Sequence, residues 1–243
     1  MLRSTIKELL AAPVERLPEK EAIRYKKGKN EIVGKTYLQL KNDSEKFSAV
    51  LKSLGEQGSH IALVGATSYE WLVTYFGIVN SASVAVPLDV LLPAEELCEL
   101  VDRADATVFV VDEVRADVLN MAKERCPKLK YVISMQKKEE AGEILSFSQL
   151  MDVQTPGFDC EISPEQLATI MFTSGTTGKS KGVMLTHRNL AENATCLDMK
   201  ISENTVMLSV LPIHHAYCLT MDFLKGLYNG STICLNDSLM RMA

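Results

Sequence analysis

The chain has 243 residues, 47% of them hydrophobic and 23% charged, which is typical of a globular protein with one large domain or two small ones. Its formal net charge of −5 argues against a general nucleic-acid-binding protein, because such proteins usually carry an excess of Lys and Arg. The six cysteines are irregularly spaced and form no CxxC pair, so we expect free thiols in a reducing, cytoplasmic compartment.

Residues 1–57 predict a helix, a β-hairpin and a longer helix. The first helix is expected over about residues 4–10, and two strand-like segments then flank a turn at 28–30. Thr36 and Gln39 have the spacing of a capping box, in which each side chain bonds the backbone of the other residue. We therefore expect the second helix to begin after Thr36 and to end near residue 51.

From residue 60 onward, short apolar segments alternate with helical patterns. The predicted strands are 60–66, 83–88, 107–112, 130–135, 167–173, 182–186, 205–212 and 231–236. The predicted helices are 67–81, 93–104, 114–125, 187–199 and 216–228, the first of them starting at a capping box of Thr67 and Glu70. This alternation predicts an α/β fold, a doubly wound and mostly parallel sheet with helices on both faces.

Two segments bear on the domain organisation. Residues 71–88 form an uncharged run, but Asn80, Ser81 and Pro87 interrupt it, so we expect a buried helix and a buried strand and no membrane span. Residues 136–164 are polar and irregular, with one short helical piece, and they interrupt the alternation. We therefore divide the chain into a lead helix and hairpin (1–57) and an α/β unit (58–243) with a seam at about 136–164.

The segment TSGTTGKSKG, residues 173–182, has the chemistry of a phosphate-binding loop. Glycines let backbone N–H groups converge on an anion, lysines neutralise its charge, and hydroxyl groups bond phosphate oxygens or approach Mg²⁺. The candidate residues are Thr173, Ser174, Gly175, Thr176, Thr177, Gly178, Lys179, Lys181 and Gly182, with Thr176 as the candidate magnesium ligand.

Two other interpretations fit this segment less well. A P-loop NTPase would need glycine at position 173, where this chain has Thr173, and a helix directly after the loop, where 182–186 is strand-like. A flexible linker is disfavoured because apolar strand sequence lies on both sides and two lysines are spaced among the glycines. Phosphate binding by a loop between two strands is therefore the leading hypothesis.

The segment IMFTSGTTGKSKGVMLTHRNL closely resembles the signature T-S-G-T-T-G-x-P-K-G-V-x-x-[ST]-H of the adenylate-forming superfamily, which includes acyl-CoA synthetases. Ser180 stands where that signature has proline, which leaves the loop freer. The resemblance covers nearly the whole chain and is specific at 170–189 and 208–217. It implies that residues 173–181 hold the β- and γ-phosphates of ATP, with Mg²⁺, while a small-molecule carboxylic acid attacks the α-phosphorus.

The second informative segment is LSVLPIHHAY, residues 208–217. Adjacent histidines do not face one way on a helix or a strand, so the residues alone favour a polar strand-to-helix junction over a metal site. The segment resembles the L-P-x-x-H of acyl-CoA synthetases, and matching positions assign His215, rather than His214, to the acyl-carboxylate site. The doubled histidine with Tyr217 is most similar to bacterial long-chain fatty acid–CoA ligases. His187 is expected to be structural.

Several features of the superfamily are missing from this sequence. It contains no Y-G-x-T-E segment, no T-G-D for the ribose, and no C-terminal domain, on which CoA binding largely depends. The resemblance therefore implies the N-terminal portion of the AMP-binding large domain of a fatty acid–CoA ligase, inactive alone. The alternative is a non-catalytic module that binds a nucleotide or a partner.

Overall fold

The computed structural model describes residues 4–28, 31–135, 144–173, 180–197 and 199–236. The helices are α1 (Ile6–Arg16), α2 (Tyr37–Ser53), α3 (Tyr69–Asn80), α4 (Ala94–Arg103), α5 (Asp117–Arg125), α6 (Phe147–Asp152), α7 (His187–Cys196) and α8 (Gly226–Tyr228), with a 3₁₀ turn η1 (Glu113–Arg115) and a π-helix η2 (Cys218–Lys225). The strands are β1 (Glu21–Lys27), β2 (Glu31–Thr36), β3 (His60–Val64), β4 (Val84–Leu88), β5 (Ala106–Val111), β6 (Tyr131–Ser134), β7 (Ile144–Ser146), β8 (Leu167–Thr173), β9 (Lys181–Thr186), β10 (Val206–Ser209) and β11 (Thr232–Leu235).

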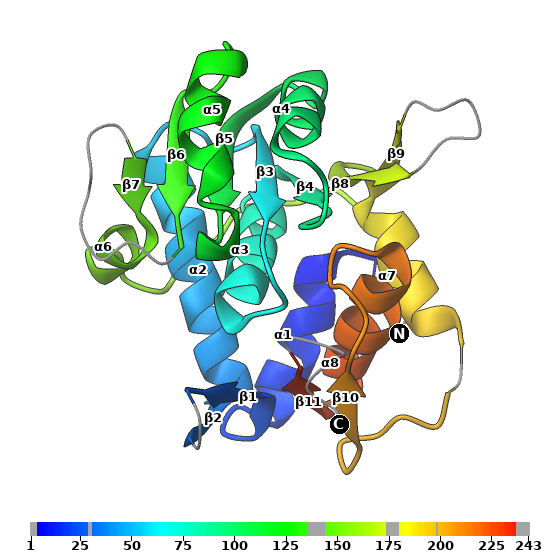
Figure 1. The fold of residues 1–243 in the computed structure, drawn as a ribbon. Coiled ribbons are helices and arrows are strands. Elements are labelled where there is room, and N and C mark those ends of the chain that lie inside the picture. The colour runs from blue at the N-terminus through cyan, green and yellow to red at the C-terminus, as the bar shows by residue number, and fades with distance from the viewer. Residues whose placement is uncertain (1–3, 29–30, 136–143, 174–179, 198, 237–243) are drawn as a thin grey trace.

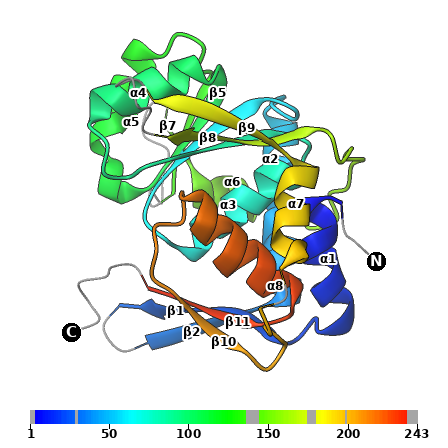
Figure 2. The ribbon, with the colours of Figure 1, turned by 90° about the vertical axis from the view of Figure 1, so that its right-hand side faces the viewer.

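The larger sheet has seven strands in the order β7-β6-β5-β3-β4-β8-β9, and only the β8–β9 pair is antiparallel. Alternate side chains of β3 enter different cores: Ile61 and Leu63 pack with helices α2 and α3, whereas Ala62 and Val64 pack with α4 and α5. Helices therefore cover both faces, as Figures 1 and 2 show. This arrangement confirms the predicted α/β fold with a mostly parallel sheet.

The strands do not all join one sheet. Strands β10, β11, β1 and β2 form a second, four-stranded sheet, in which β1 pairs in parallel with β11 and antiparallel with β2. Figure 2 shows helices α1, α3, α7 and α8 between this sheet and the larger one. The lead hairpin thus shares a sheet with residues 206–209 and 232–235. Local periodicity cannot reveal such a pairing, because it joins opposite ends of the sequence.

The uncharged run at 71–88 is divided between a buried helix and a buried strand, as predicted. Trp71 and Tyr75 of α3 are fully buried and their rings stack, with centroids 5.6 Å apart, while every residue of β4 is buried. No helix within the described ranges combines the length and the apolar character that a membrane crossing needs.

Helices α2 and α3 approach closely at Gly77. A Cβ atom added there would lie 2.7 Å from the Cβ of Phe47 and 2.8 Å from the carbonyl oxygen of Ser44. The hydroxyl of Ser48 donates to the Gly77 carbonyl at 2.7 Å, so the two backbones are joined across this contact. The absence of a side chain at Gly77 therefore allows the helix pair to pack.

Candidate functional site

The site is built at the edge of the larger sheet where the parallel strands end. In open α/β sheets, ligands bind in the crevice outside the carboxyl ends of the strands. Strands β3, β4, β5 and β8 are parallel, so the residues that follow them start from this edge. Gly65, after β3, would place a Cβ 2.7 Å from the Cβ of Asp112, after β5, and Asp112 is 4% exposed. The two strand ends therefore lie in close contact.

Hairpin β8–β9 carries the candidate phosphate-binding segment. Thr173 pairs with Lys181 and Phe172 with Gly182, so the segment joins two antiparallel strands and no helix follows it directly. This confirms the loop between two strands and argues against a P-loop NTPase. Thr173, Lys181 and Gly182 are exposed at the base of the hairpin. The other candidates, Ser174, Gly175, Thr176, Thr177, Gly178 and Lys179, lie outside the described residues.

His214 reaches the edge of the larger sheet. Its Nε2 lies 3.5 Å from Oδ1 of Asp89, the residue after β4, and its side chain is 8% exposed. The distance is that of an ion pair, but the geometry does not make a hydrogen bond, and Nε2 is buried without a hydrogen-bond partner. Burial lowers the pKa of His214, Asp89 opposes that shift, and His215 adds to it. The ring is therefore held mainly in its neutral form at pH 7.

His215, the sequence-based candidate, has different surroundings. It is exposed, and its ring centroid lies 4.4 Å from that of His214. Its N–H donates to Pro212 at 3.1 Å and its carbonyl accepts from Leu219 at 3.0 Å, which fixes the backbone where η2 begins. In the part of the chain that the structure describes, no hydrogen bond or ion pair joins the His215 ring to hairpin β8–β9.

Arg115 holds the segment that carries Asp89, and the sequence analysis did not find it. Its guanidinium donates to the carbonyls of Val90 at 2.8 Å and Leu92 at 2.6 Å, and it makes a two-point pair with the Asp117 carboxylate at 2.9 and 3.0 Å. Only 11% of its side chain is exposed. Three groups thus fix the fork of the guanidinium, and the segment after β4 is held rigidly. Arg115 and Asp117 lie two residues apart soon after a strand-like segment. This spacing could have indicated an arginine that is held by a carboxylate.

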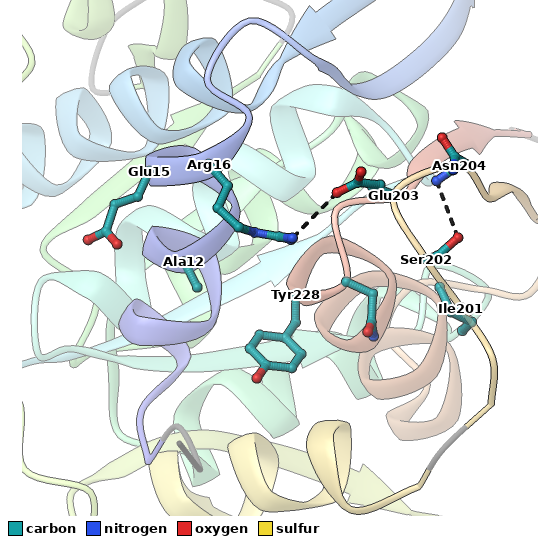
Figure 3. A pocket seen from close by; sticks show the side chains of 9 residues that line it. Ala12, Glu15, Arg16, Ile201, Ser202, Glu203, Asn204 and Tyr228 are labelled. Atoms are coloured by element: carbon teal, nitrogen blue, oxygen red, sulfur yellow. Dashed lines mark hydrogen bonds and ion pairs between the residues drawn. The ribbon is translucent and has the colours of Figure 1, made fainter.

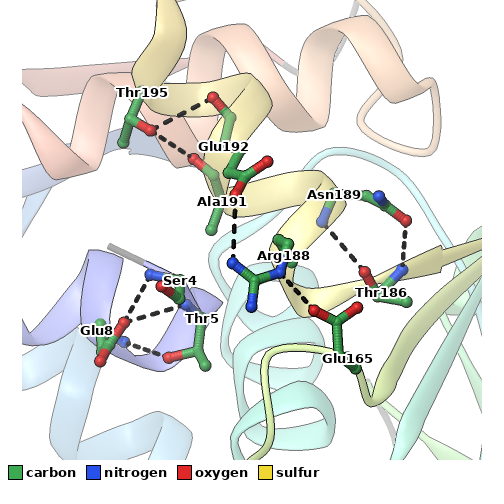
Figure 4. A network of polar contacts seen from close by, with 10 residues as sticks. All are labelled: Ser4, Thr5, Glu8, Glu165, Thr186, Arg188, Asn189, Ala191, Glu192 and Thr195. Carbon is green, nitrogen blue, oxygen red and sulfur yellow. Dashed lines mark hydrogen bonds and ion pairs between the residues drawn. The ribbon is translucent and has the colours of Figure 1, made fainter. Parts of the chain in front are cut away.

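Two helix starts meet at the opposite edge of the larger sheet, where β8 begins and β9 ends. Figure 4 shows the capping boxes of α1, with Thr5 and Glu8, and of α7, with Thr186 and Asn189. His187, the first residue of α7, is fully buried, and its Nδ1 accepts the N–H of Ile6 at 3.4 Å. Burial lowers the pKa of His187 to about 4, so the ring is neutral and joins α7 to α1. This geometry agrees with the structural role expected for His187.

We expect His187 to make folding stability depend on pH. Its pKa is about 4 when folded and about 6.5 when unfolded, so between these values the unfolded chain binds more protons. Stability is therefore lost as the pH falls from about 6.5 to 4, by up to about 3 kcal/mol from this residue. Urea unfolding at pH 7 and pH 4.5 should show a smaller difference for His187→Gln than for the wild type. An equal difference would contradict the assignment.

A pocket of about 670 Å³ lies elsewhere, between α1, residues 201–204 and α8 (Figure 3). Its wall includes an ion pair, with Arg16 Nη1 3.4 Å from Glu203 Oε2. None of the sequence-predicted site residues lines this pocket. We therefore place the candidate site at the carboxyl edge of the larger sheet and not here.

Comparisons with known proteins show which family the chain belongs to. A family model described as "AMP-binding enzyme" matches residues 10–242. The chain is 30% identical over 206 residues to the long-chain-fatty-acid–CoA ligase 5 of Rattus norvegicus, covering 75% of this chain and 30% of that protein. It is 28% identical over 209 residues to the 4-coumarate–CoA ligase of Vanilla planifolia, covering 82% of this chain and 38% of that protein.

Solved structures show the same fold. The anthranilate CoA ligase AuaEII, in complex with anthranoyl-AMP, superposes with a TM-score of 0.91 at 21% identity, over 100% of this chain and 46% of that one. A long-chain-fatty-acid-CoA ligase (FadD1) from Archaeoglobus fulgidus gives a TM-score of 0.85 at 22% identity, over 98% of this chain and 48% of that one. The chain thus spans less than half the length of these relatives.

Proposed function

Because the chain belongs to the AMP-binding enzyme family, we propose that it is the N-terminal portion of an ATP-dependent acyl-CoA ligase. The observation that carries the proposal is hairpin β8–β9, whose strands flank the lysine- and glycine-rich segment in the chain and belong to a mostly parallel sheet. The relatives named above are ligases that join carboxylic acids to CoA, according to their names. The division into a lead segment (1–57) and an α/β unit (58–243) stays a prediction.

Residues 173–182 would hold the phosphates of ATP. In the reaction, a carboxylate oxygen attacks the α-phosphorus and pyrophosphate leaves with the electron pair of the broken bond. Lys179 and Lys181 would neutralise the charge of the β- and γ-phosphates, and glycine N–H groups would bond their oxygens. The hydroxyl of Thr176 is an oxygen ligand of the kind that Mg²⁺ prefers, and the bound ion would offset phosphate charge.

The histidine pair would form one wall of the acyl-carboxylate site. We assign the contact with the carboxylate to His215, because its ring is exposed, and a supporting role to His214, whose ring lies buried between Asp89 and His215. We assign His215 to the acyl carboxylate only, and not to the phosphates of the nucleotide.

We propose a fatty acid as the acid substrate, since the doubled histidine resembles that class of ligase and a long-chain fatty acid ligase is among the relatives. CoA would bind mostly outside these residues, and the second reaction step would replace AMP by the CoA thiol. The six cysteines are free, which supports the predicted cytoplasmic compartment.

The type of phosphate chemistry can be tested by the products formed. The chain is incubated with MgATP, with and without fatty acids of graded length, and followed by ³¹P NMR and calorimetry. We expect saturable MgATP binding and no release of ADP and phosphate. ADP and phosphate formed without any acid would overturn the proposal in favour of an NTPase.

A further inference from the structure

Arg103, the last residue of α4, contacts the base of hairpin β8–β9 at Phe172 of β8 and at Ser180, the residue before β9. Its Nη2 donates to the carbonyl of Ser180 at 2.8 Å, and its guanidinium carbon lies 5.6 Å from the centroid of the Phe172 ring. Glu99, one turn earlier on α4, lies 3.6 Å from Nη1 of the same group. A planar guanidinium suits this place because it can donate to a carbonyl and lie over an aromatic ring at once.

The hairpin has little other support at this end. Strand β9 is an edge strand that pairs with β8 alone, and Val183 and Met184 are 43% and 65% exposed. Strand β8 pairs with β4 through the single register pair Ala85–Thr169. In the described part of the chain, the Arg103 bond is the one hydrogen bond from another element to residues 172–173 or 180–182.

We propose that Arg103 is a positioning residue, which ties the base of the hairpin to α4 so that Lys181 and its neighbours are held toward the nucleotide. The effect on the nucleotide rests on the proposed function, whereas the contact between Arg103 and the hairpin does not. Helix α4 lies beside the hairpin in both views (Figures 1 and 2), and its own position is fixed by buried Leu97, Leu100 and Val101. A helix with a buried face thus contacts the exposed end of a hairpin whose second strand, β9, lies at the edge of the sheet.

Hydrogen exchange of the 243-residue chain tests the tie without any ligand. We expect Arg103→Ala to speed exchange in peptides covering β9 about 5-fold, while peptides from β3 and β5 are unchanged. Arg103→Lys keeps the charge but not the planar fork, and should restore part of the protection. Arg125→Ala removes an exposed arginine of α5 and should leave β9 unchanged. Equal exchange of β9 in the wild type and Arg103→Ala would overturn the proposal.

Nucleotide binding then separates a positioning role from a merely structural one. We expect the Kd for MgATP to rise about 5-fold in Arg103→Ala and to stay unchanged in Arg125→Ala. Faster exchange in β9 with an unchanged Kd would refute positioning for the nucleotide. If the wild-type chain binds no MgATP at all, the proposed function fails, and the exchange experiment still decides whether Arg103 holds the hairpin.

Discussion

Replacing both Lys179 and Lys181 by alanine is expected to weaken MgATP binding by at least about 100-fold. A hydrogen bond between an ammonium group and a phosphate oxygen contributes about 1.5–3 kcal/mol, so the loss of two such bonds amounts to two or more factors of ten. Lys181 begins β9, opposite Thr173, so it stands where the strand leaves the candidate loop. Titration calorimetry at an ionic strength of about 0.15 M measures the change directly.

The matched control for this experiment is Lys26→Ala with Lys27→Ala. These lysines are exposed on β1 and their removal changes the net charge by the same amount. The control should bind MgATP within about twofold of the wild type, because screening removes most of the effect of distant surface charges. An equal loss in both double variants would mean that overall charge, and not the candidate loop, governs binding.

Replacing Gly77 by alanine is expected to lower the free energy of unfolding by about 3 kcal/mol. The new methyl group would lie within 3 Å of the Cβ of Phe47 and of the carbonyl oxygen of Ser44, and neither atom can move without shifting α2. Alanine favours a helix over glycine by about 1 kcal/mol, so the measured loss is what remains after this gain. Urea denaturation measures the change from the transition midpoint and slope.

Gly226, in α8, supplies the control for Gly77. A Cβ added there would meet Sδ of Met207 at 2.9 Å, and its next neighbours are also side-chain atoms, of Ile233 and Ser231. Since such atoms can rotate away, Gly226→Ala should cost less than about 1 kcal/mol. A similar loss in both variants would contradict the view that the α2–α3 backbone contact makes Gly77 special.

Elements with a strong local signal could be predicted from the sequence. The capping box of Thr36 and Gln39 is present as expected, with the Gln39 side chain accepting the Thr36 N–H at 2.9 Å. The predicted box of Thr67 and Glu70 was wrong by one residue, because Ser68 caps α3 by accepting the N–H of Trp71 at 3.1 Å. Thr, Ser and Asp all cap helices well, so neighbouring candidates compete and the spacing alone does not choose between them.

The seam at 136–164 shows where local patterns fail. Its short helical piece is α6, as predicted, but strand β7 before it was missed. Strand β7 has three residues, too few for an alternating pattern to be recognised, and it gains its structure by pairing with β6. Tertiary pairing, and not its own sequence, makes this segment a strand.

The contacts around the candidate site could not be predicted. The candidate phosphate-binding segment has a dense motif, whereas the contacts near its two ends join distant residues. Arg103 and Ser180 are 77 positions apart, and Asp89 and His214 are further apart still. No spacing rule links such residues, so only the folded chain shows that Arg103 of α4 contacts the hairpin and that Asp89 lies near His214.

The pairing of β1 with β11 has a consequence for how the protein is made. The Thr232 hydroxyl donates to the Glu21 carbonyl at 2.7 Å across 211 positions of sequence. On the ribosome, the first hairpin therefore emerges long before its partner strand exists, and one of its edges stays open while the intervening residues are made. Chaperones that shield exposed strand edges should matter more for the yield of this protein than for a chain whose strands pair with sequence neighbours.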